Sequence, residues 1–232
     1  MKKENILFGF VGLLLGLIIG FFFANSINQQ GPVAPSAAVQ PSGDLPPGHP
    51  AVGGNNSDGA AIPEVQGAID KAKQNPSDLD AQLKAAELYY QIQRFDGAIE
   101  FLKKANALQP DNYEVMVQLA NVNFDADHYG EAEKWYTAAL AKKADDPVVR
   151  TDLGLTFIYR DEPNYERAVQ EFKRVLAAKP NHIPALQNLT VAYTKKAETA
   201  NAKSTLAKLE ELDPSNTGLT KLREDIQKLE SK

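Results

Sequence analysis

The side chains that most often carry chemistry are few in this sequence and stand far apart. The 232-residue chain has no cysteine, which excludes disulfides, thiol catalysis and cysteine-based metal or cluster sites. The three histidines, His49, His128 and His182, lie in separate segments, so no pair has the spacing of a metal site on one helix. We therefore expect each histidine to be a surface residue, and we expect no metal and no cofactor.

One segment begins like a calcium-binding loop. Residues 125–130 read Asp-Ala-Asp-His-Tyr-Gly, with two carboxylates and a glycine where such a loop needs them. The match fails at Tyr129 and Tyr136, where the loop requires an oxygen ligand and a closing acidic residue. The segment is better interpreted as a turn between two helices. We also find no nucleophile–base set, so the sequence predicts a protein that is not an enzyme. An accessory domain with hidden catalysis is the least favoured alternative.

The charge balance indicates protein partners rather than nucleic acid. The chain has 25 basic and 30 acidic side chains. Residues 63–232 keep 23 and 27 of them, a net charge near −4. Nucleic-acid binding requires a basic stripe, which this balance does not supply.

The elements that must position any binding residues repeat along the second half of the chain. Prolines stand at Pro76, Pro110, Pro180 and Pro214, in steps of 34, 70 and 34 residues, and the long step divides as 34 plus 36 at Ala144. A fixed period of this size is typical of stacked helical repeats. The repeats are 79–112, 113–146, 147–182 and 183–216.

Each repeat contains two segments with helical periodicity, and matching places hold matching residues. In the first segments, residues at spacings of three and four share one helix face. These are Ala85, Ala86 and Tyr89; Leu119, Ala120 and Asn123; Leu153, Gly154 and Phe157; and Leu189, Thr190 and Tyr193. The second segments have a small–large–small order that suits close helix crossing: Ala98, Leu102 and Ala105; Ala132, Tyr136 and Ala139; Ala168, Phe172 and Val175; and Ala202, Leu206 and Leu209.

On these triplets, Gly154 and the closing prolines, the chain resembles the tetratricopeptide repeat family. The resemblance implies an all-α fold, a right-handed superhelical solenoid of antiparallel helix pairs. The chain departs from the family pattern at three points. The place of the family's early tryptophan holds Gln82, Met116, Arg150 and Leu186. The second repeat ends in Ala144 instead of proline, and the third has two extra residues in the turn Arg160–Asn164. An unrelated helical bundle with accidental periodicity is the alternative.

In this family the first helices of the repeats line a concave groove that binds protein or peptide partners. Transferring that geometry predicts a groove lined by Leu83, Glu87, Tyr90, Val117, Asn121, Phe124, Thr151, Leu155, Ile158, Gln187, Val191 and Thr194. The set contains no Lys or Arg, so the family's cationic clamp for acidic peptide tails is not expected. An apolar helix or extended peptide fits better, unless the last helix of the array covers part of the groove.

The repeats need protected ends and capped helices. We predict an N-terminal helix within 63–76 and a capping helix within 217–232, whose apolar face holds Leu219, Leu222, Ile226 and Leu229. That face either covers the last repeat or docks a partner. Asp and Asn residues beside the closing turns are expected to cap the following helices. They are Asp78, Asp111, Asn112, Asp145, Asn181 and Asn216.

The amino-terminal segment predicts a membrane anchor. Residues 6–24 carry no charge, and 19 residues of helix reach about 28 Å, close to the thickness of a bilayer core. We favour a retained signal anchor over a cleaved signal peptide, because the apolar run is long for the latter. Lys2 and Lys3 place residues 1–5 in the cytoplasm and the rest outside it. In a bacterium, we expect a single pass through the inner membrane, with the repeat domain in the periplasm or at the cell exterior.

A glycine stands at every fourth residue of that span, at Gly12, Gly16 and Gly20. This spacing lets two membrane helices approach closely and predicts a helix-packing face, through which the protein would form an oligomer or join a partner. Chance is the competing explanation, because glycine is common in membrane helices.

Residues 25–62 are rich in Gly, Pro, Ala and Ser, with Asp44 and Asp58 as their only charges, and predict a disordered linker. The stretch 45–50, Leu-Pro-Pro-Gly-His-Pro, is either a spacer or a docking peptide. It bears a weak resemblance to segments of membrane-anchored repeat proteins of c-type cytochrome assembly.

Anchor, linker and repeats together predict a membrane-anchored scaffold that holds or assembles membrane or periplasmic proteins, in envelope or cytochrome biogenesis. The alternative is a structural subunit of a membrane complex, attached through Gly12, Gly16 and Gly20.

Overall fold

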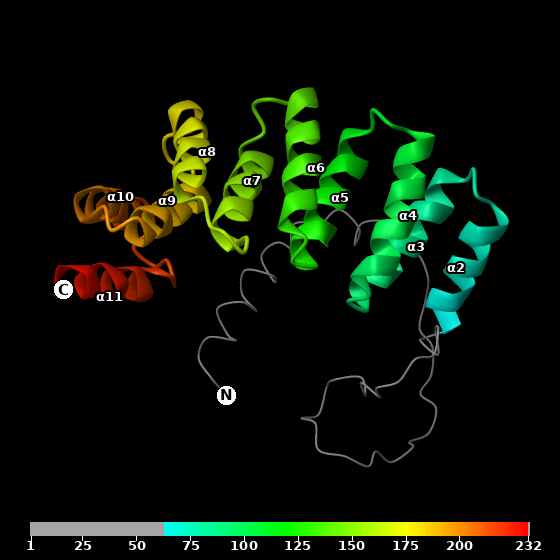
Figure 1. Ribbon diagram of the computed structural model, residues 1–232, viewed down its shortest axis with the longest axis horizontal. Coiled ribbons are helices and arrows are strands. Elements are labelled where there is room, and N and C mark those ends of the chain that lie inside the picture. The colour runs from blue at the N-terminus through cyan, green and yellow to red at the C-terminus, as the bar shows by residue number, and fades with distance from the viewer. Residues whose placement is uncertain (1–62, 232) are drawn as a thin grey trace, which may run out of the picture. The chain divides into compact units, whose positions relative to one another are not determined.

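The computed structural model describes residues 63–231, and every element in that range is a helix (Figure 1). The helices are α2 (Pro63–Gln74), α3 (Leu79–Gln91), α4 (Phe95–Leu108), α5 (Tyr113–Asp125), α6 (Tyr129–Lys142), α7 (Pro147–Tyr159), α8 (Tyr165–Ala178), α9 (Ile183–Lys195), α10 (Thr199–Leu212) and α11 (Leu219–Glu230). The predicted all-helical class is therefore confirmed for this range.

The expectations for residues 1–62, including the membrane span, its three glycines and the linker, lie outside the described residues. Among the helices of residues 63–231, none combines the length and the apolar character needed to cross a membrane.

The helices form successive pairs. α3 packs against α4, α5 against α6, α7 against α8 and α9 against α10, and each pair also packs on the next one. Figure 1 shows the pairs following one another from α2 to α10, with α2 beside α3 and α11 beside α9 and α10. Each helix buries one face against neighbours close in sequence, as in a solenoid of repeats.

The core consists of the residues that recur at matching places. All twelve residues predicted to form the core of the second helices are buried. In the first helices ten of the twelve are buried, and the other two, Tyr89 and Tyr193, are half-buried. Gly154 shows why size matters here: a Cβ atom on it would lie under 3.0 Å from the ring of Phe172, which is fully buried. The small residue is therefore required for α7 and α8 to approach each other.

The turns inside the repeats explain the two extra residues of the third repeat. Three of these turns have three residues, and their middle residues, Gln93, Asp127 and Ala197, have positive φ angles of 59°, 59° and 57°. The turn Arg160–Asn164 has five residues and no positive φ among them. Its extra length lets the chain reverse without a left-handed residue.

The helix caps partly correct the sequence-based expectation. Asp78 and Asn112 accept hydrogen bonds from the nitrogens of Ala81 and Val115, both at 3.1 Å. α7 and α9 are instead capped by Asp146 and His182, one residue after the predicted Asp145 and Asn181. Asp111 is no cap either, because Asn112 is the residue with extended backbone directly before α5. The half-buried His182 thus has a structural role at this position rather than being only a surface residue.

Two of the residues that replace the tryptophan bind the preceding turn. The buried Gln82 donates from Nε2 to the carbonyls of Ala72 and Asn75, at 2.8 and 3.2 Å. Arg150 donates to the carbonyl of Ala144 at 2.7 Å and to Glu171 at 2.7 Å. Polar residues at this place therefore fix the turns between neighbouring pairs, including the turn that lacks its proline.

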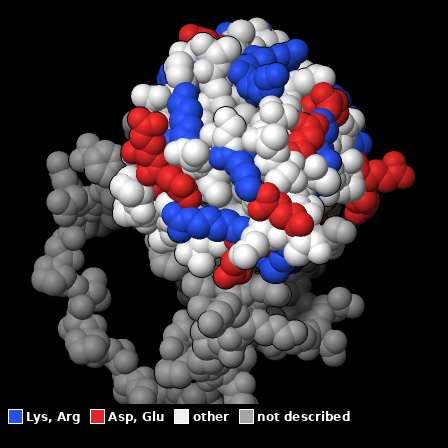
Figure 2. Space-filling model, turned by 90° about the vertical axis from the view of Figure 1, so that its left-hand side faces the viewer, with Lys and Arg blue, Asp and Glu red and all other residues white. Residues whose placement is uncertain are grey.

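The C-terminal end is closed by α11. Leu219, Leu222 and Ile226 are buried against the last pair. Ion pairs join Lys203 to Glu230 and Arg223 to Glu210 at the margin. Figure 2, which views this end of the molecule, shows acidic and basic side chains interspersed over the surface. Within the described residues the apolar face of α11 covers the last repeat, as the capping interpretation expects.

Candidate functional site

The twelve residues predicted to line a groove all belong to the first helices, α3, α5, α7 and α9. Ten of them are half-buried, which leaves part of each side chain accessible. The exceptions are Thr151 and Ile158, which are only 3% and 8% exposed. These two were expected to face a ligand, but they pack inside the array and offer it little surface.

The accessible face is best described by a stripe of residues at spacings of three and four on each first helix. We call it the inner stripe, because its middle members are four of the predicted groove residues. It consists of Lys84, Glu87 and Gln91 on α3; Gln118, Asn121 and Asp125 on α5; Asp152, Leu155 and Tyr159 on α7; and Asn188, Val191 and Lys195 on α9.

On α3 the polar groups of the stripe bind one another. Lys84 Nζ lies 3.1 Å from Glu87 Oε2, and Gln91 Nε2 donates to Glu87 Oε1 at 3.0 Å. The carboxylate of Glu87 therefore has both a cation and an amide on its own helix. A ligand gains little from it, because those contacts would first have to be replaced.

On α5 the stripe is held by tyrosines from neighbouring helices. The buried Tyr136 of α6 donates its hydroxyl to Asn121 Oδ1 at 2.8 Å, and Tyr90 of α3 donates to Asp125 Oδ2 at 2.5 Å. Burial, and after it the Asp125 hydrogen bond and charge, raises the pKa of Tyr90 well above its ordinary value. The amide nitrogen of Asn121 keeps its hydrogens available, because only its oxygen is engaged.

On α7 the stripe contains a carboxylate without a partner. Asp152 is half-buried, and no hydrogen bond or ion pair joins it to any residue of the range 63–231. Burial, and after it the charges of Asp146 and Asp125, raises the pKa of Asp152 to about 7. The ionised carboxylate is therefore unfavourable in this position until a cation reaches it.

Sequence reasoning missed Asp152. It lies one residue after Thr151, and the predicted set included Thr151 and not its neighbour. The repeat period offered a signal, because Asp152 stands 34 residues after Gln118 and one helical turn before Leu155. Comparing charge at that place across the four repeats would have identified it.

Three aromatic rings gather where α5 and α7 end, and one of them, Tyr159, also belongs to the inner stripe. The ring of Phe124 lies 5.4 Å from that of Tyr129 and 6.0 Å from that of Tyr159, edge to face in both cases, and the two tyrosine rings are stacked at 6.4 Å. We call these three residues the aromatic edge. Tyr159 is 46% exposed, so one large ring of the edge remains open to a ligand.

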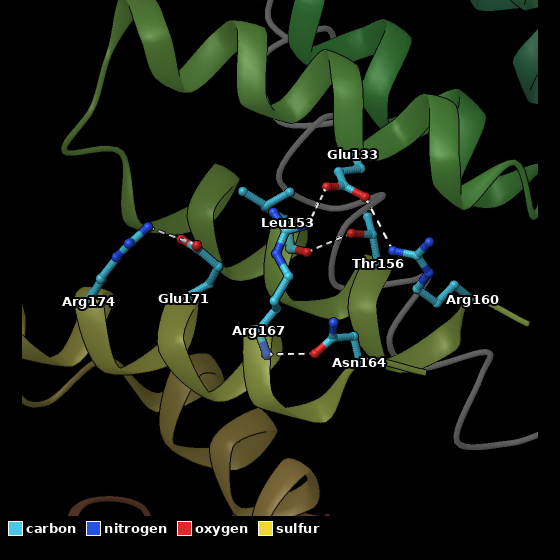
Figure 3. Close-up of polar contacts among 8 residues, drawn as sticks. All are labelled: Glu133, Leu153, Thr156, Arg160, Asn164, Arg167, Glu171 and Arg174. Atoms are coloured by element: carbon cyan, nitrogen blue, oxygen red, sulfur yellow. Dashed lines mark hydrogen bonds and ion pairs between the residues drawn. The ribbon is translucent and has the colours of Figure 1, made fainter. Parts of the chain in front are cut away.

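The turn after Tyr159 is anchored on α6, as Figure 3 shows. Glu133 of α6 accepts from Arg160 at 3.3 Å and from Arg167 at 2.8 Å. Asn164 caps α8 by accepting from the nitrogen of Arg167 at 3.0 Å. The longer turn is therefore attached at both ends, which holds the aromatic edge in position.

The region 125–130 is a helix-to-helix turn, in which the Tyr129 hydroxyl donates to Asp127 Oδ1 at 2.5 Å. Throughout residues 63–231, no three His, Asp or Glu side chains are gathered in a way that could hold a metal ion.

Comparisons with known proteins agree with this architecture. Two family models described as tetratricopeptide repeat match residues 93–151 and 59–113. No curated protein matches the sequence significantly.

Many solved structures are similar in fold, among them the following three. A crystal structure of MamA has 25% sequence identity and a TM-score of 0.59, with 65% of this chain and 86% of that chain covered. MamA from Desulfovibrio magneticus RS-1, residues 41 to the end, has 17% identity and a TM-score of 0.59, covering 66% and 85%. YrrB, a repeat protein with an unusual peptide-binding site, has 17% identity and a TM-score of 0.53, covering 71% and 89%.

Proposed function

We propose that this protein, a member of the tetratricopeptide repeat family, is a scaffold that binds a partner protein or peptide along the inner stripe of its first helices. The observation that carries the proposal is the stretch between α5 and α7. There, the half-buried carboxylate of Asp152 has no hydrogen-bond or ion-pair partner in the range 63–231, and the amide nitrogen of Asn121 is not engaged. Tyr159, beside them on α7, is 46% exposed. Such groups gain from a ligand that supplies the missing contacts.

The last helix does not fill this stretch. α11 packs on α10 and α9, at the C-terminal end of the array. The alternative in which the groove is occupied by the array's own capping helix is therefore disfavoured for α5 and α7, and the ligand would come from outside the described residues.

The finer part of the proposal concerns location. We propose a single pass through the bacterial inner membrane by residues 6–24, with the repeats on the periplasmic side. It is supported by the 19 uncharged residues and by Lys2 and Lys3 before them. Held near the membrane, the repeats would assemble membrane or periplasmic proteins, in envelope or cytochrome biogenesis.

The groove is tested by recovering partners of the full-length protein from detergent-solubilised membranes. Replacing Tyr90 and Phe124 together by alanine removes two half-buried aromatic side chains of the predicted groove and should abolish recovery of the specific partners. Trp135→Ala is the matched control, because Trp135 is a half-buried aromatic of α6 that packs on the core clusters. It should retain the partners. If the double variant folds, by circular dichroism, and still binds like the wild type, the groove assignment is wrong.

The four-residue spacing of Gly12, Gly16 and Gly20 favours a second candidate, a structural subunit held in a membrane complex through its span. Replacing the three glycines by leucine should then release the protein from the complex. A chain beginning at Pro63 that binds the partner as well as the full chain would exclude this role.

A further inference from the structure

The inner stripe differs in charge along its length. Between α5 and α7 it contains Asp125 and Asp152, and the charge of Asp146 at the start of α7 also acts on Asp152. α5 has no Lys or Arg, and the only one on α7, Arg150, is engaged by Glu171 and by the carbonyl of Ala144. The stripe has two lysines, Lys84 on α3 and Lys195 on α9, and both lie outside the stretch on α5 and α7. The stretch is therefore negative, with no cation of its own to balance it.

The isolated carboxylate is Asp152. Its two acidic neighbours are differently placed: Asp125 accepts a hydrogen bond from Tyr90, and Asp146 accepts two from the backbone at the start of α7. The charge of Asp152 also acts on Tyr136 of α6. The Tyr136 hydroxyl donates its hydrogen bond to Asn121 and not to Asp152. Burying part of a carboxylate without a hydrogen-bond donor is unfavourable in free energy. A charged donor from a ligand would offset this by forming a charge-assisted hydrogen bond.

The surroundings of Asp152 match one kind of side chain. Tyr159 lies two helical turns further along the same face of α7 and exposes its ring. The free amide hydrogens of Asn121, on the adjacent first helix, suit a peptide carbonyl. Carboxylate, aromatic ring and amide together favour a long cationic side chain on an extended peptide, because the ring attracts the cation and covers its apolar stem.

We propose that the stretch of the inner stripe on α5 and α7 binds a Lys or Arg side chain of an extended partner peptide. Asp152 accepts the hydrogen bonds of the cation, and Tyr159 packs on its stem. The inference rests on the proposed function and specifies the partner: a segment with a basic residue, opposite in charge to the acidic tails that a cationic groove binds.

The test is a selection of binders from a displayed library of random dodecapeptides, using the full-length protein in detergent micelles. Peptides bound by the wild type should be enriched in Arg and Lys relative to the input library, at one position of a shared motif. Asp152→Asn changes one atom and removes the charge, so peptides selected on it should have lost that enrichment. Glu211→Gln, which removes an exposed charge on α10 outside the stripe, should select the same basic motif as the wild type.

A second measurement makes the result quantitative. The best selected peptide and its copy with Gln in place of the basic residue are compared by fluorescence anisotropy. We expect about tenfold weaker binding of the Gln copy by the wild type, equal to about 1.4 kcal/mol, and equal binding of both copies by Asp152→Asn.

The outcomes separate the two proposals. Selection of a shared motif that lacks basic residues, or unchanged enrichment on Asp152→Asn, overturns the inference and leaves peptide binding in the groove intact. If the wild type selects no motif, or if the Tyr90 and Phe124 double variant selects the same motif as the wild type, groove binding itself is overturned and the inference with it.

Discussion

The first and third repeats share the same pair of packed helices but differ in whether the polar side chains of the inner stripe have partners. In the first, formed by α3 and α4, the inner stripe is a closed set, because Lys84 and Gln91 both bind Glu87. In the third, formed by α7 and α8, the stripe presents Asp152, which has no partner within residues 63–231, and Tyr159, which is 46% exposed. The tight ionic contacts of that repeat lie elsewhere, around Glu171.

The core residues and the stripe residues of the two repeats vary independently of each other. Matching core places remain small or apolar in both repeats, because each pair must pack on the next. The stripe is under no such packing requirement, so the first repeat neutralises the charge of Glu87 internally, whereas the third leaves Asp152 without a partner among the described residues. The following variants test that separation.

The largest effect is expected from Gly154→Ala compared with Gly97→Ala. At both positions an added Cβ meets an aromatic ring closer than 3.0 Å. Behind Gly154 that ring is Phe172, which is fully buried and cannot turn aside, whereas Tyr89 beside Gly97 is half-buried. We expect Gly154→Ala to lower the free energy of unfolding by about 3 kcal/mol and Gly97→Ala by about 1 kcal/mol or less. Urea denaturation measures both, and Gly130→Ala, with open space at its Cβ, is the control.

A smaller effect should follow from removing the ion pairs of the two repeats. Glu171, with 8% of its side chain exposed, binds Arg150 at 2.7 Å. It also binds Arg174 at 2.9 Å, a contact drawn in Figure 3. Glu171→Ala should cost about 2 kcal/mol, because the half-buried Arg150 then loses its counter-charge. Glu87→Ala in the first repeat should cost no more than about 0.5 kcal/mol, since the partner Lys84 is exposed. Equal losses by thermal denaturation would contradict the contrast between the repeats.

The fold was largely predictable because it depends on residue size at fixed intervals. The residues of the small–large–small order, such as Ala168, Phe172 and Val175, are buried as their spacing requires. The longer turn of the third repeat was also visible as two extra residues. The caps at Asp146 and His182 were missed by one residue. The chain around each turn offers two adjacent polar residues, and backbone angles decide which of them caps the helix.

The candidate site was less predictable. The residues on the accessible face could be transferred from the family geometry, but which of them have partners depends on contacts between helices far apart in sequence. Asn121 is engaged by Tyr136 and Asp125 by Tyr90, and neither contact follows from periodicity. The isolation of Asp152 is likewise a property of the packed array, since it requires that no cation of another helix reach it.

Asp152→Asn is expected to stabilise the protein in a pH-dependent way. Asp152 has a pKa of about 7 in the folded protein and about 4 when unfolded. The unfolded chain therefore ionises first as pH rises, and the free energy of unfolding falls between about pH 4 and 7 and is level above. The charges acting on it are those of Asp125 of α5 and Asp146 at the start of α7, and its own charge raises the pKa of Tyr136 of α6. Denaturation at pH 5 and pH 8 should show the variant about 1–2 kcal/mol more stable than wild type at pH 8 and by a clearly smaller margin at pH 5, where only about a third of the loss has occurred. The same gain at both values would show that the carboxylate charge is not the cause.

The smallest effect on stability, and the sharpest contrast with the first repeat, is expected from Tyr159→Ala. Tyr89, at the end of α3, is stacked on the buried Phe101 at 5.7 Å, so Tyr89→Ala should cost about 2–3 kcal/mol. Tyr159 is 46% exposed, and its ring pairs with those of Phe124 and Tyr129 at 6.0 and 6.4 Å, so its removal should cost about 0.5–1 kcal/mol. The same variant should weaken binding of a selected basic peptide severalfold, because the ring covers the stem of the cation. A ring kept for folding would give the reverse result, with a large loss of stability and unchanged binding. That result would mean that the aromatic edge stabilises the fold and does not contact the peptide.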